Sequence, residues 1–403
     1  MEKKKLYIVG GIVGVLVVAI GAVLMSGRVT NRAGRAAVAF EEERNRSSSN
    51  QEYTSPDENG VAKKVQSAEV ATPEIMMLQF QMQYRYPLDS RPLTRTMTDL
   101  TEPFKIQPAR HPIYAHNPPG EGEKPLLYYS WSGPSHVVTA NSPAVAFLEV
   151  FDLDGNVVKP RVISADVYSD FTFGRKLAGQ ATSEAAGDGK TKISWTPRDG
   201  ERLHWGEIEL RVLFDTPNVK NNLVVADFSS TPTAPALFTG DYYDHLENGS
   251  LVIDASIDVK KAGKYVFDAN VFDQSGEPYG RVHLVTYLER GQQKLPLQFF
   301  GIIFHDREFN QGKLVLKNLR GRRMNLPFDP RKLDGMLARG EVIPTNTEPL
   351  DEWIPLPSPD YVTGRSYDVD EFSKKEYEGL DKAERLKQVQ QYARDWDKQN
   401  GQS

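Results

Sequence analysis

Short runs of alternating or β-branched residues follow one another from about residue 105 onward, separated by Gly, Pro, Asn and Asp. Residues 250–259 (SLVIDASIDV) are the clearest case, because a hydrophobic residue occupies every second position from 251 to 259. This alternation predicts a strand with one face in a core and the other in water. Similar runs occur at 144–151, 162–173, 207–214, 223–228, 264–272, 282–288 and 294–300. Strands with this spacing and with turn residues between them predict β-sandwiches and disfavour a doubly wound α/β fold.

A short repeat suggests how many sandwiches the chain contains. VFDLDG at 150–155 is echoed by VFDQSG at 271–276, an offset of 121 residues, and an Arg-Val pair follows each copy. Each copy is typical of a strand, a tight turn and a second strand. A sandwich takes about 100 residues. We therefore expect a mainly β fold with two tandem immunoglobulin-like β-sandwiches, at residues 105–218 and 219–325.

Composition excludes several classes of protein. The 403 residues contain no Cys, which excludes disulfide-stapled scaffolds, thiolate zinc sites, iron–sulfur clusters and a cysteine nucleophile. Hydrophobic residues make up 39% of the chain, enough for a sizeable core. The net charge is −5, and no basic stripe stands out among the scattered acidic and basic residues. We therefore expect no nucleic-acid partner.

An apolar segment near the N-terminus predicts a membrane anchor. Residues 6–25 carry no charge, and about 20 helical residues span the ~30 Å hydrocarbon core of a bilayer. Three lysines precede the segment, at positions 3–5. We predict a cytoplasmic tail at 1–5 and a transmembrane signal anchor at 6–26 that contacts the lipid bilayer. The expected product is a single-pass inner-membrane protein with most of its chain periplasmic or extracellular.

Two further interpretations concern the same segment. A secretory signal peptide cleaved near Ala36 and Ala37 is the alternative to an uncleaved anchor. Gly10 and Gly14 form a GxxxG pair, the spacing that lets two transmembrane helices pack closely as a homodimer.

The regions that flank the sandwiches differ in composition. Residues 27–104 begin with a polar stretch and predict a flexible tether and lead-in. Residues 326–365 are rich in Pro, which favours extended chain at the surface. Residues 366–400 predict an amphipathic helix with Ser373 and Glu376 as a capping box. This helix either packs on its own domain or binds a partner.

Three stretches within residues 237–323 carry a resemblance to a known family: FTGDYYDHLENGSLVIDASIDVKKAGKYVFDANVFDQSGEP, QKLPLQFFGIIFHD and GKLVLKNLRG. In these stretches the chain resembles the bacterial domain family called choice-of-anchor X. The resemblance implies an exported β-sandwich protein tethered to the cell envelope, and it carries over no catalytic residue. The apparent N-terminal anchor departs from the family, so its C-terminal sorting signals are not expected here.

One candidate metal site follows the first copy of the repeat. Asp152, Asp154 and Asn156 offer oxygen ligands at alternate positions, like the start of a calcium loop. The glycine and the bidentate Glu of an EF-hand loop are missing, and Ile163 stands where that Glu would be. A hairpin turn explains the same composition.

A second candidate is Asp241, Asp244 and His245, which bring two carboxylates and an imidazole close together in the sequence. Polar residues beside a strand are the alternative explanation. The chain has no HExxH, GxSxG, P-loop or GxGxxG motif. We therefore assign no catalytic or cofactor-binding residue and expect no cofactor.

The sequence favours a binding or structural protein over an enzyme. We expect an anchored envelope protein whose sandwiches contact an envelope protein or a glycan. The alternative is an envelope hydrolase or a metal-dependent accessory enzyme, with its site near Asp241, Asp244 and His245.

Overall fold

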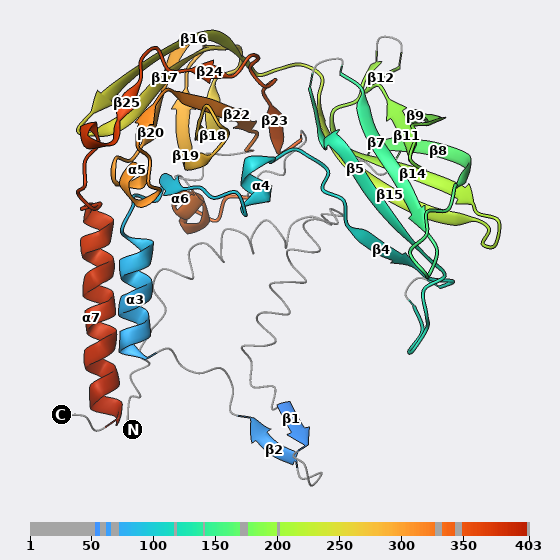
Figure 1. Cartoon of the computed structure of the whole chain (residues 1–403), viewed down its shortest axis with the longest axis horizontal. Helices are drawn as coiled ribbons and strands as arrows, with labels where there is room; N and C mark the ends of the chain where they lie inside the picture. The colour runs from blue at the N-terminus through green and yellow to red at the C-terminus, as the bar shows by residue number, and fades with distance from the viewer. Residues whose placement is uncertain are drawn as a thin grey trace. The chain divides into compact units, whose positions relative to one another are not determined.

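A computed structural model describes residues 53–56, 62–65, 72–116, 119–139, 142–169, 176–199, 202–326, 333–342 and 349–400 (Figure 1). These residues are mainly β and form several sheets, which confirms the fold class at that level. The predicted tail, the anchor and the Gly10–Gly14 pair lie outside the described residues. Among the described helices, none combines the length and apolarity needed to cross a bilayer. The chain divides into two compact units, and residues 83–340 and 346–383 form the larger one.

Two five-stranded sheets with a shared core form the first sandwich (Figure 1). One sheet has the order β10-β11-β7-β5-β4, with bounds Thr182–Ala185, Thr191–Trp195, Ala144–Phe151, Leu127–Ser135 and Arg110–Ile113. The other has the order β6-β15-β14-β8-β9, with bounds Val137–Thr139, Asn222–Thr231, Gly206–Asp215, Arg161–Ser169 and Lys176–Gln180. Neighbouring strands are antiparallel except β6 and β15, which are parallel.

Alternation along the strands builds this core. β7 buries Ala146, Leu148 and Val150 completely, at every second position. Val212 of β14 and Val224 of β15 approach them from the other sheet. Burial of apolar surface, at about 25 cal/mol per Å², therefore holds the sheets together in a chain that has no Cys.

A three-stranded and a six-stranded sheet form the second sandwich around another core. The first has the order β16-β17-β20, with bounds Ala236–Glu247, Ser250–Val259 and Gly291–Phe299. The second has the order β23-β22-β18-β19-β3, with bounds Asp351–Trp353, Leu314–Met324, Gly263–Asp273, Pro278–Leu288 and Ser90–Pro92. Its sixth strand, β24 (Tyr361–Val362), also pairs with β22. The short helix α5 (Ile302–Asp306) follows β20.

Strand pairing differs from the predicted domain bounds in three places. β3 lies in the predicted tether but pairs with β19, and the next residue, Leu93, is fully buried. β23 and β24 come from the Pro-rich segment and pair with β22. β15 lies beyond the 218/219 boundary but pairs with β14, so the first sandwich continues to Thr231. The pairings of β3, β23 and β24 join segments far apart in the sequence, where local composition carries no signal, whereas β14 and β15 are neighbours in the chain.

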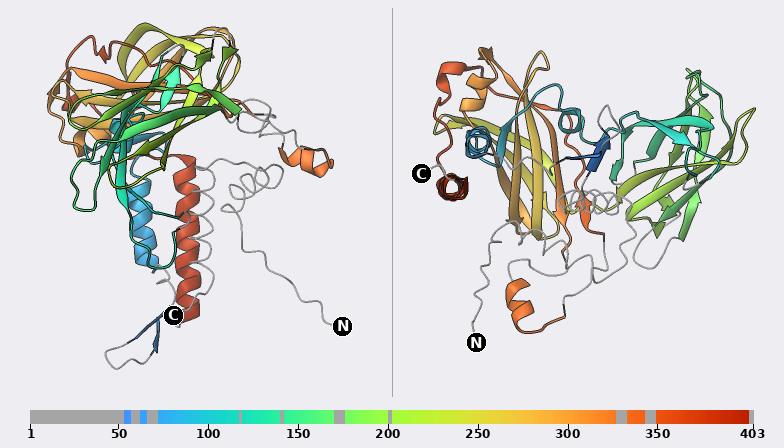
Figure 2. Two further views of the ribbon diagram at one scale, coloured as in Figure 1. Left: turned by 90° about the vertical axis from the view of Figure 1, so that its right-hand side faces the viewer. Right: turned by 90° about the horizontal axis from the view of Figure 1, so that it is seen from below.

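The C-terminal helix is shorter than predicted. α7 is Leu380–Asn400, and residues 366–379 instead contain β25 (Tyr367–Asp368) and the 3₁₀ helix η2 (Val369–Glu371). The capping box that forms is Asp368 with Glu371, not Ser373 with Glu376. Within the smaller unit, α7 lies beside α3 (Pro73–Gln83), as Figures 1 and 2 show.

The entry and exit of the larger unit are joined by one residue, Arg85. Its guanidinium donates to both carboxylate oxygens of Asp306, at 2.8 and 2.7 Å, and to Glu376, at 2.6 Å. Its backbone oxygen accepts a hydrogen bond from the backbone N–H of Tyr377, at 3.1 Å. Residues 85 and 377 are thus held together.

The sequence repeat is a repeated turn rather than a repeated domain. In both copies the backbone N–H of the turn glycine, Gly155 or Gly276, donates to the backbone carbonyl of the Asp three residues earlier. Both glycines have a φ of 87°. The first copy links β7 to β8, which lie in opposite sheets. The second links β18 to β19, which are neighbours in one sheet. The two copies therefore occupy different positions in their sandwiches.

Candidate binding surface at one end of the first sandwich

Four connections gather at one end of the first sandwich, which we call the loop end: the described parts 114–116 and 119–126 of the first, and residues 152–160, 186–190 and 216–221. The strand register requires this. The last residue of β14 pairs with the first residue of β8, because Asp215 is opposite Arg161. Tyr128 at the start of β5 is opposite Phe151 at the end of β7. Loops at one end of a sandwich are the usual place for recognition.

The loop at 152–160 is held by its first residue. The Asp152 carboxylate accepts hydrogen bonds from the backbone N–H of Asp154 at 3.0 Å, and from the backbone N–H and side-chain amide of Asn156 at 2.8 and 3.0 Å. The side-chain bond from Asn156 is the main cause that lowers the pKa of Asp152. The three residues predicted as calcium ligands are thus adjacent, but their polar atoms bond to one another as in an Asx turn.

The loop at 186–190 packs against the loop at 152–160. A Cβ placed on Gly189 would lie only 2.3 Å from Val157 Cγ1, so the two loops approach as closely as a glycine allows. Gly189 also has a φ of 76°, which disfavours other residues. Lys190 Nζ lies 3.8 Å from Glu149 Oε2 of β7. The two loops therefore form one surface.

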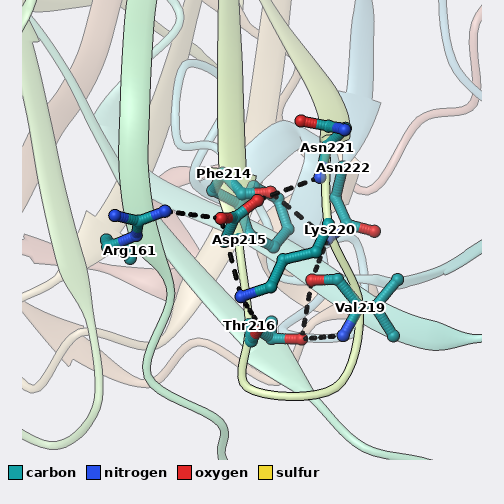
Figure 3. Close-up of polar contacts among 8 residues, drawn as sticks. All are labelled: Arg161, Phe214, Asp215, Thr216, Val219, Lys220, Asn221 and Asn222. Carbon is teal, nitrogen blue, oxygen red and sulfur yellow. Dashed lines mark hydrogen bonds and ion pairs between the residues drawn. The ribbon is translucent and has the colours of Figure 1, made fainter.

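A buried carboxylate fixes the loop at 216–221 (Figure 3). Asp215 is 5% exposed and accepts a hydrogen bond from the backbone N–H of Asn221 at 3.0 Å. Arg161 donates to the other oxygen at 2.7 Å, and Lys220 Nζ lies 3.6 Å from it. The bond from Asn221, followed by the bond from Arg161, lowers the pKa of Asp215. Asp215 therefore ties this loop to the start of β8.

Two further side chains close the same loop (Figure 3). The Thr216 hydroxyl accepts from the backbone N–H of Val219 at 3.1 Å and donates to its carbonyl at 3.2 Å. The Asn222 side-chain amide donates to the carbonyls of Phe214 and Val219, at 3.2 Å each. The loop is preorganised, which lowers the entropy lost when a partner binds.

The fixed loops expose apolar and charged side chains together. Leu153 is 59% exposed and Val157 is 48% exposed, both on the loop at 152–160. The side chains of Arg161 and Lys220 are 77% and 60% exposed. An apolar tip with a charged surround is the usual composition of a protein interface.

The second predicted cluster lies elsewhere, along β16. The Asp244 carboxylate accepts from the hydroxyls of Tyr361 and Tyr367 and from the backbone N–H of Gly364. Burial raises the pKa of Asp244, but these bonds outweigh it and the net shift is downward. Asp244 thereby fastens the Pro-rich segment to the second sandwich.

The other two members of that cluster have separate surroundings. Asp241 is exposed and accepts a hydrogen bond from Thr239 at 2.9 Å. His245 stacks on Tyr243 with ring centroids 5.3 Å apart. Adjacent strand residues face opposite sides of a sheet, so Asp244 and His245 point apart. Among the described residues no three His, Asp or Glu side chains are grouped as metal ligands.

Sequence reasoning missed the loop end as an assembly. It singled out Asp152 but not Asp215 or Val157. The run DTPNVKN after the strand at 207–214 is a turn signal that marks one of the loops. A local turn signal predicts that a loop exists. Which loops lie side by side depends on the order of the strands in the sheets, which a local signal does not predict.

Comparisons with known proteins give structural neighbours only. No model of a known family and no curated protein sequence matches the chain. A DUF4785 family protein from Legionella pneumophila matches with 17% identity and a TM-score of 0.35, over 49% of this chain and 52% of that one. Trypsin-activated alpha-2-macroglobulin from Escherichia coli matches with 10% identity and a TM-score of 0.22, over 50% and 15%. Dimeric latent PorU from Porphyromonas gingivalis matches with 17% identity and a TM-score of 0.16, over 47% and 17%. This chain spans about half the length of the Legionella protein. None of these likenesses assigns a function, and the resemblance to the choice-of-anchor X family stays a prediction.

Proposed function

We propose that this chain is a membrane-anchored, extracytoplasmic binding protein of the bacterial envelope, and that the loop end of its first sandwich contacts an envelope protein or glycan. The observation that carries the proposal is the preorganised loop set. Asp152, Gly189 and Asp215 fix three loops, and Leu153 and Val157 are exposed on one of them. Two apolar side chains exposed on one rigid loop, beside charged side chains on its neighbours, are available to a partner without reordering the loops, which supports recognition at this end.

Strand order supports an immunoglobulin-like assignment for the first sandwich. With β5, β7, β8, β9, β10, β11, β14 and β15 as strands A, B, C, C′, D, E, F and G, one sheet is ABED and the other GFCC′. In this assignment the loop end carries the B–C, D–E and F–G loops. The B–C and F–G loops belong to the end that antibody variable domains use for binding.

Site-specific photocrosslinking in intact cells tests the surface. A photoreactive amino acid replaces Leu153 in the full chain, and the matched control replaces Leu177 of β9. Both leucines are 59% exposed, but Leu177 pairs with Tyr168, at the other end of β8. We expect a reproducible envelope adduct from position 153 and none from 177. Equal adducts from the two positions would contradict a role for the loop end.

Protease treatment of spheroplasts tests the location. A C-terminal tag on the full chain should be lost when protease is added outside the inner membrane, and it should be protected only after the predicted anchor at 6–26 is deleted. A tag protected in both chains would contradict the envelope assignment and leave the crosslinking result to be judged separately.

A further inference from the structure

Four arginines share the outer face of the six-stranded sheet of the second sandwich. Arg91 of β3 and Arg281 of β19 are direct cross-strand partners. Arg320 of β22 is opposite Asp268, and Arg322 is opposite Val266. The core uses the odd-numbered residues of β18 from 265 to 271, so the even-numbered ones and their cross-strand partners face away from it. We call Arg91, Arg281, Arg320 and Arg322 the arginine face.

Two of these arginines have carboxylate partners and two do not. Arg320 Nε lies 3.8 Å from Asp268 Oδ2, and Arg322 Nε lies 3.1 Å from Asp351 Oδ1. Asp268 is also engaged by His283 Nδ1, at 2.9 Å from its Oδ1. Among the described residues no carboxylate lies within ion-pair distance of Arg91 or Arg281. Arg91 does donate to the backbone carbonyl of Gln83, at 2.5 Å.

The two guanidinium groups that lack a carboxylate partner repel each other. Burial is the main cause that lowers the pKa of Arg91, and the charge of Arg281 is the next. Burial likewise lowers the pKa of Arg320, against the attraction of Asp268, and the charges of Arg281 and Arg322 lower it further. Like charges directly opposite each other destabilise a sheet. Asp89 attracts the charge of Arg91, but among the described residues neither Arg91 nor Arg281 has a carboxylate within ion-pair distance.

We propose that Arg91 and Arg281 bind a phosphate group, with Arg320 and its Asp268 partner as one wall of the site. Two cross-strand guanidinium groups supply two positive charges and two planar sets of N–H donors, of which Nη1 of Arg91 already donates to the carbonyl of Gln83. A phosphate monoester carries about −1.5 to −2 charges and three acceptor oxygens at pH 7, so it matches both sets. A carboxylate carries a single negative charge and would bond to the N–H donors of only one of the two guanidinium groups. The site lies on the second sandwich and is independent of the loop end.

Binding of inorganic phosphate to the full chain tests this site. Phosphate at tenfold its Kd should raise the melting temperature by about 3 °C, measured against NaCl at the same ionic strength. Arg281→Gln should weaken the Kd by about tenfold, by calorimetry, because the second set of donors is lost. Arg290→Gln removes the same charge from an exposed turn of the same sandwich and should leave the Kd unchanged.

Several outcomes decide the proposal. In NaCl, Arg281→Gln should melt at the wild-type temperature or above it, because it removes repulsion, and this shows that the variant folds. Glucose 1-phosphate in place of phosphate separates two sources of the same group: tighter binding indicates a phosphorylated glycan, and equal binding indicates free phosphate. An equal effect of NaCl, or wild-type affinity in Arg281→Gln, would overturn the proposal.

Discussion

Single aspartates set the conformation of the loops in this protein. Asp152 and Asp273 start the two copies of the same turn, and each accepts a hydrogen bond from a backbone N–H four residues later, at 2.8 and 2.9 Å. Asp215 does the same over six residues, with Arg161 as an additional partner. In each case the carboxylate satisfies backbone donors that no strand partner reaches. The two copies of the repeated turn were predicted from the sequence because their signal is local, whereas Asp215 was not singled out.

Acid should loosen the loop at 216–221 through Asp215. The folded-state pKa of this group lies below its unfolded value of about 3.8. Its contribution to stability is therefore complete above about pH 5 and is lost as the pH falls through the folded pKa. We expect the urea midpoint of the first sandwich to fall between pH 5 and pH 2.5, and to fall less in Asp215→Asn. As the control, Asp154→Asn removes an exposed carboxylate. If the urea midpoint falls with pH as little in Asp154→Asn as in Asp215→Asn, Asp215 is excluded as the cause.

At the scale of elements, prediction succeeded where a strand is long and alternates. The runs at 144–151 and 250–259 coincide with β7 and β17. It failed for β3, β23 and β24, which have two or three residues each and form only because a long neighbouring strand offers unpaired backbone groups. The candidate site was predicted only in part. Asp152 was singled out from the sequence, but the grouping of its loop with the loops at 186–190 and 216–221 follows from strand order.

Two glycines in the loop at 186–190 distinguish the effect of its contact with the loop at 152–160 from the effect of strained backbone within the loop itself. Gly187 and Gly189 both have positive φ, at 82° and 76°, but only a Cβ on Gly189 meets Val157. Gly187→Ala should lower the free energy of unfolding of the first sandwich by about 1 kcal/mol. Gly189→Ala should lower it by about 1–3 kcal/mol more, because Val157 must move. Equal losses in urea denaturation would show that the two loops do not depend on each other.

The larger unit is organised, in chain order, around the second sandwich. Its six-stranded sheet combines β3 from before the first sandwich with β23 and β24 from the Pro-rich segment. The first sandwich thus lies, in chain order, between two parts of the second. A fragment cut at the predicted bounds of 219–325 would lack three strands, so the sequence predicted the number of sandwiches better than their limits.

Leu93 provides a test of this organisation. The side chain is fully buried, and its backbone N–H donates to the carbonyl of Tyr279 in β19 at 2.9 Å. Leu93→Ala should lower the free energy of unfolding by about 2–5 kcal/mol, with faster hydrogen exchange in β19. Leu88→Ala, at a residue 57% exposed, is the control and should have little effect. Faster exchange confined to the first sandwich would contradict the assignment of the lead-in to the second.

The bonds that join Arg85 to Asp306, Glu376 and Tyr377 affect how the protein responds to a pulling force. Tension applied between the N-terminal residues and α7 reaches the larger unit at residues 85 and 377, which are bonded to each other and, through Asp306, to α5. The force therefore passes directly between residues 85 and 377 through these bonds. Neither hydrophobic core is sheared while the bonds last. This chain, pulled from both ends, would stretch at its connections before either sandwich opened.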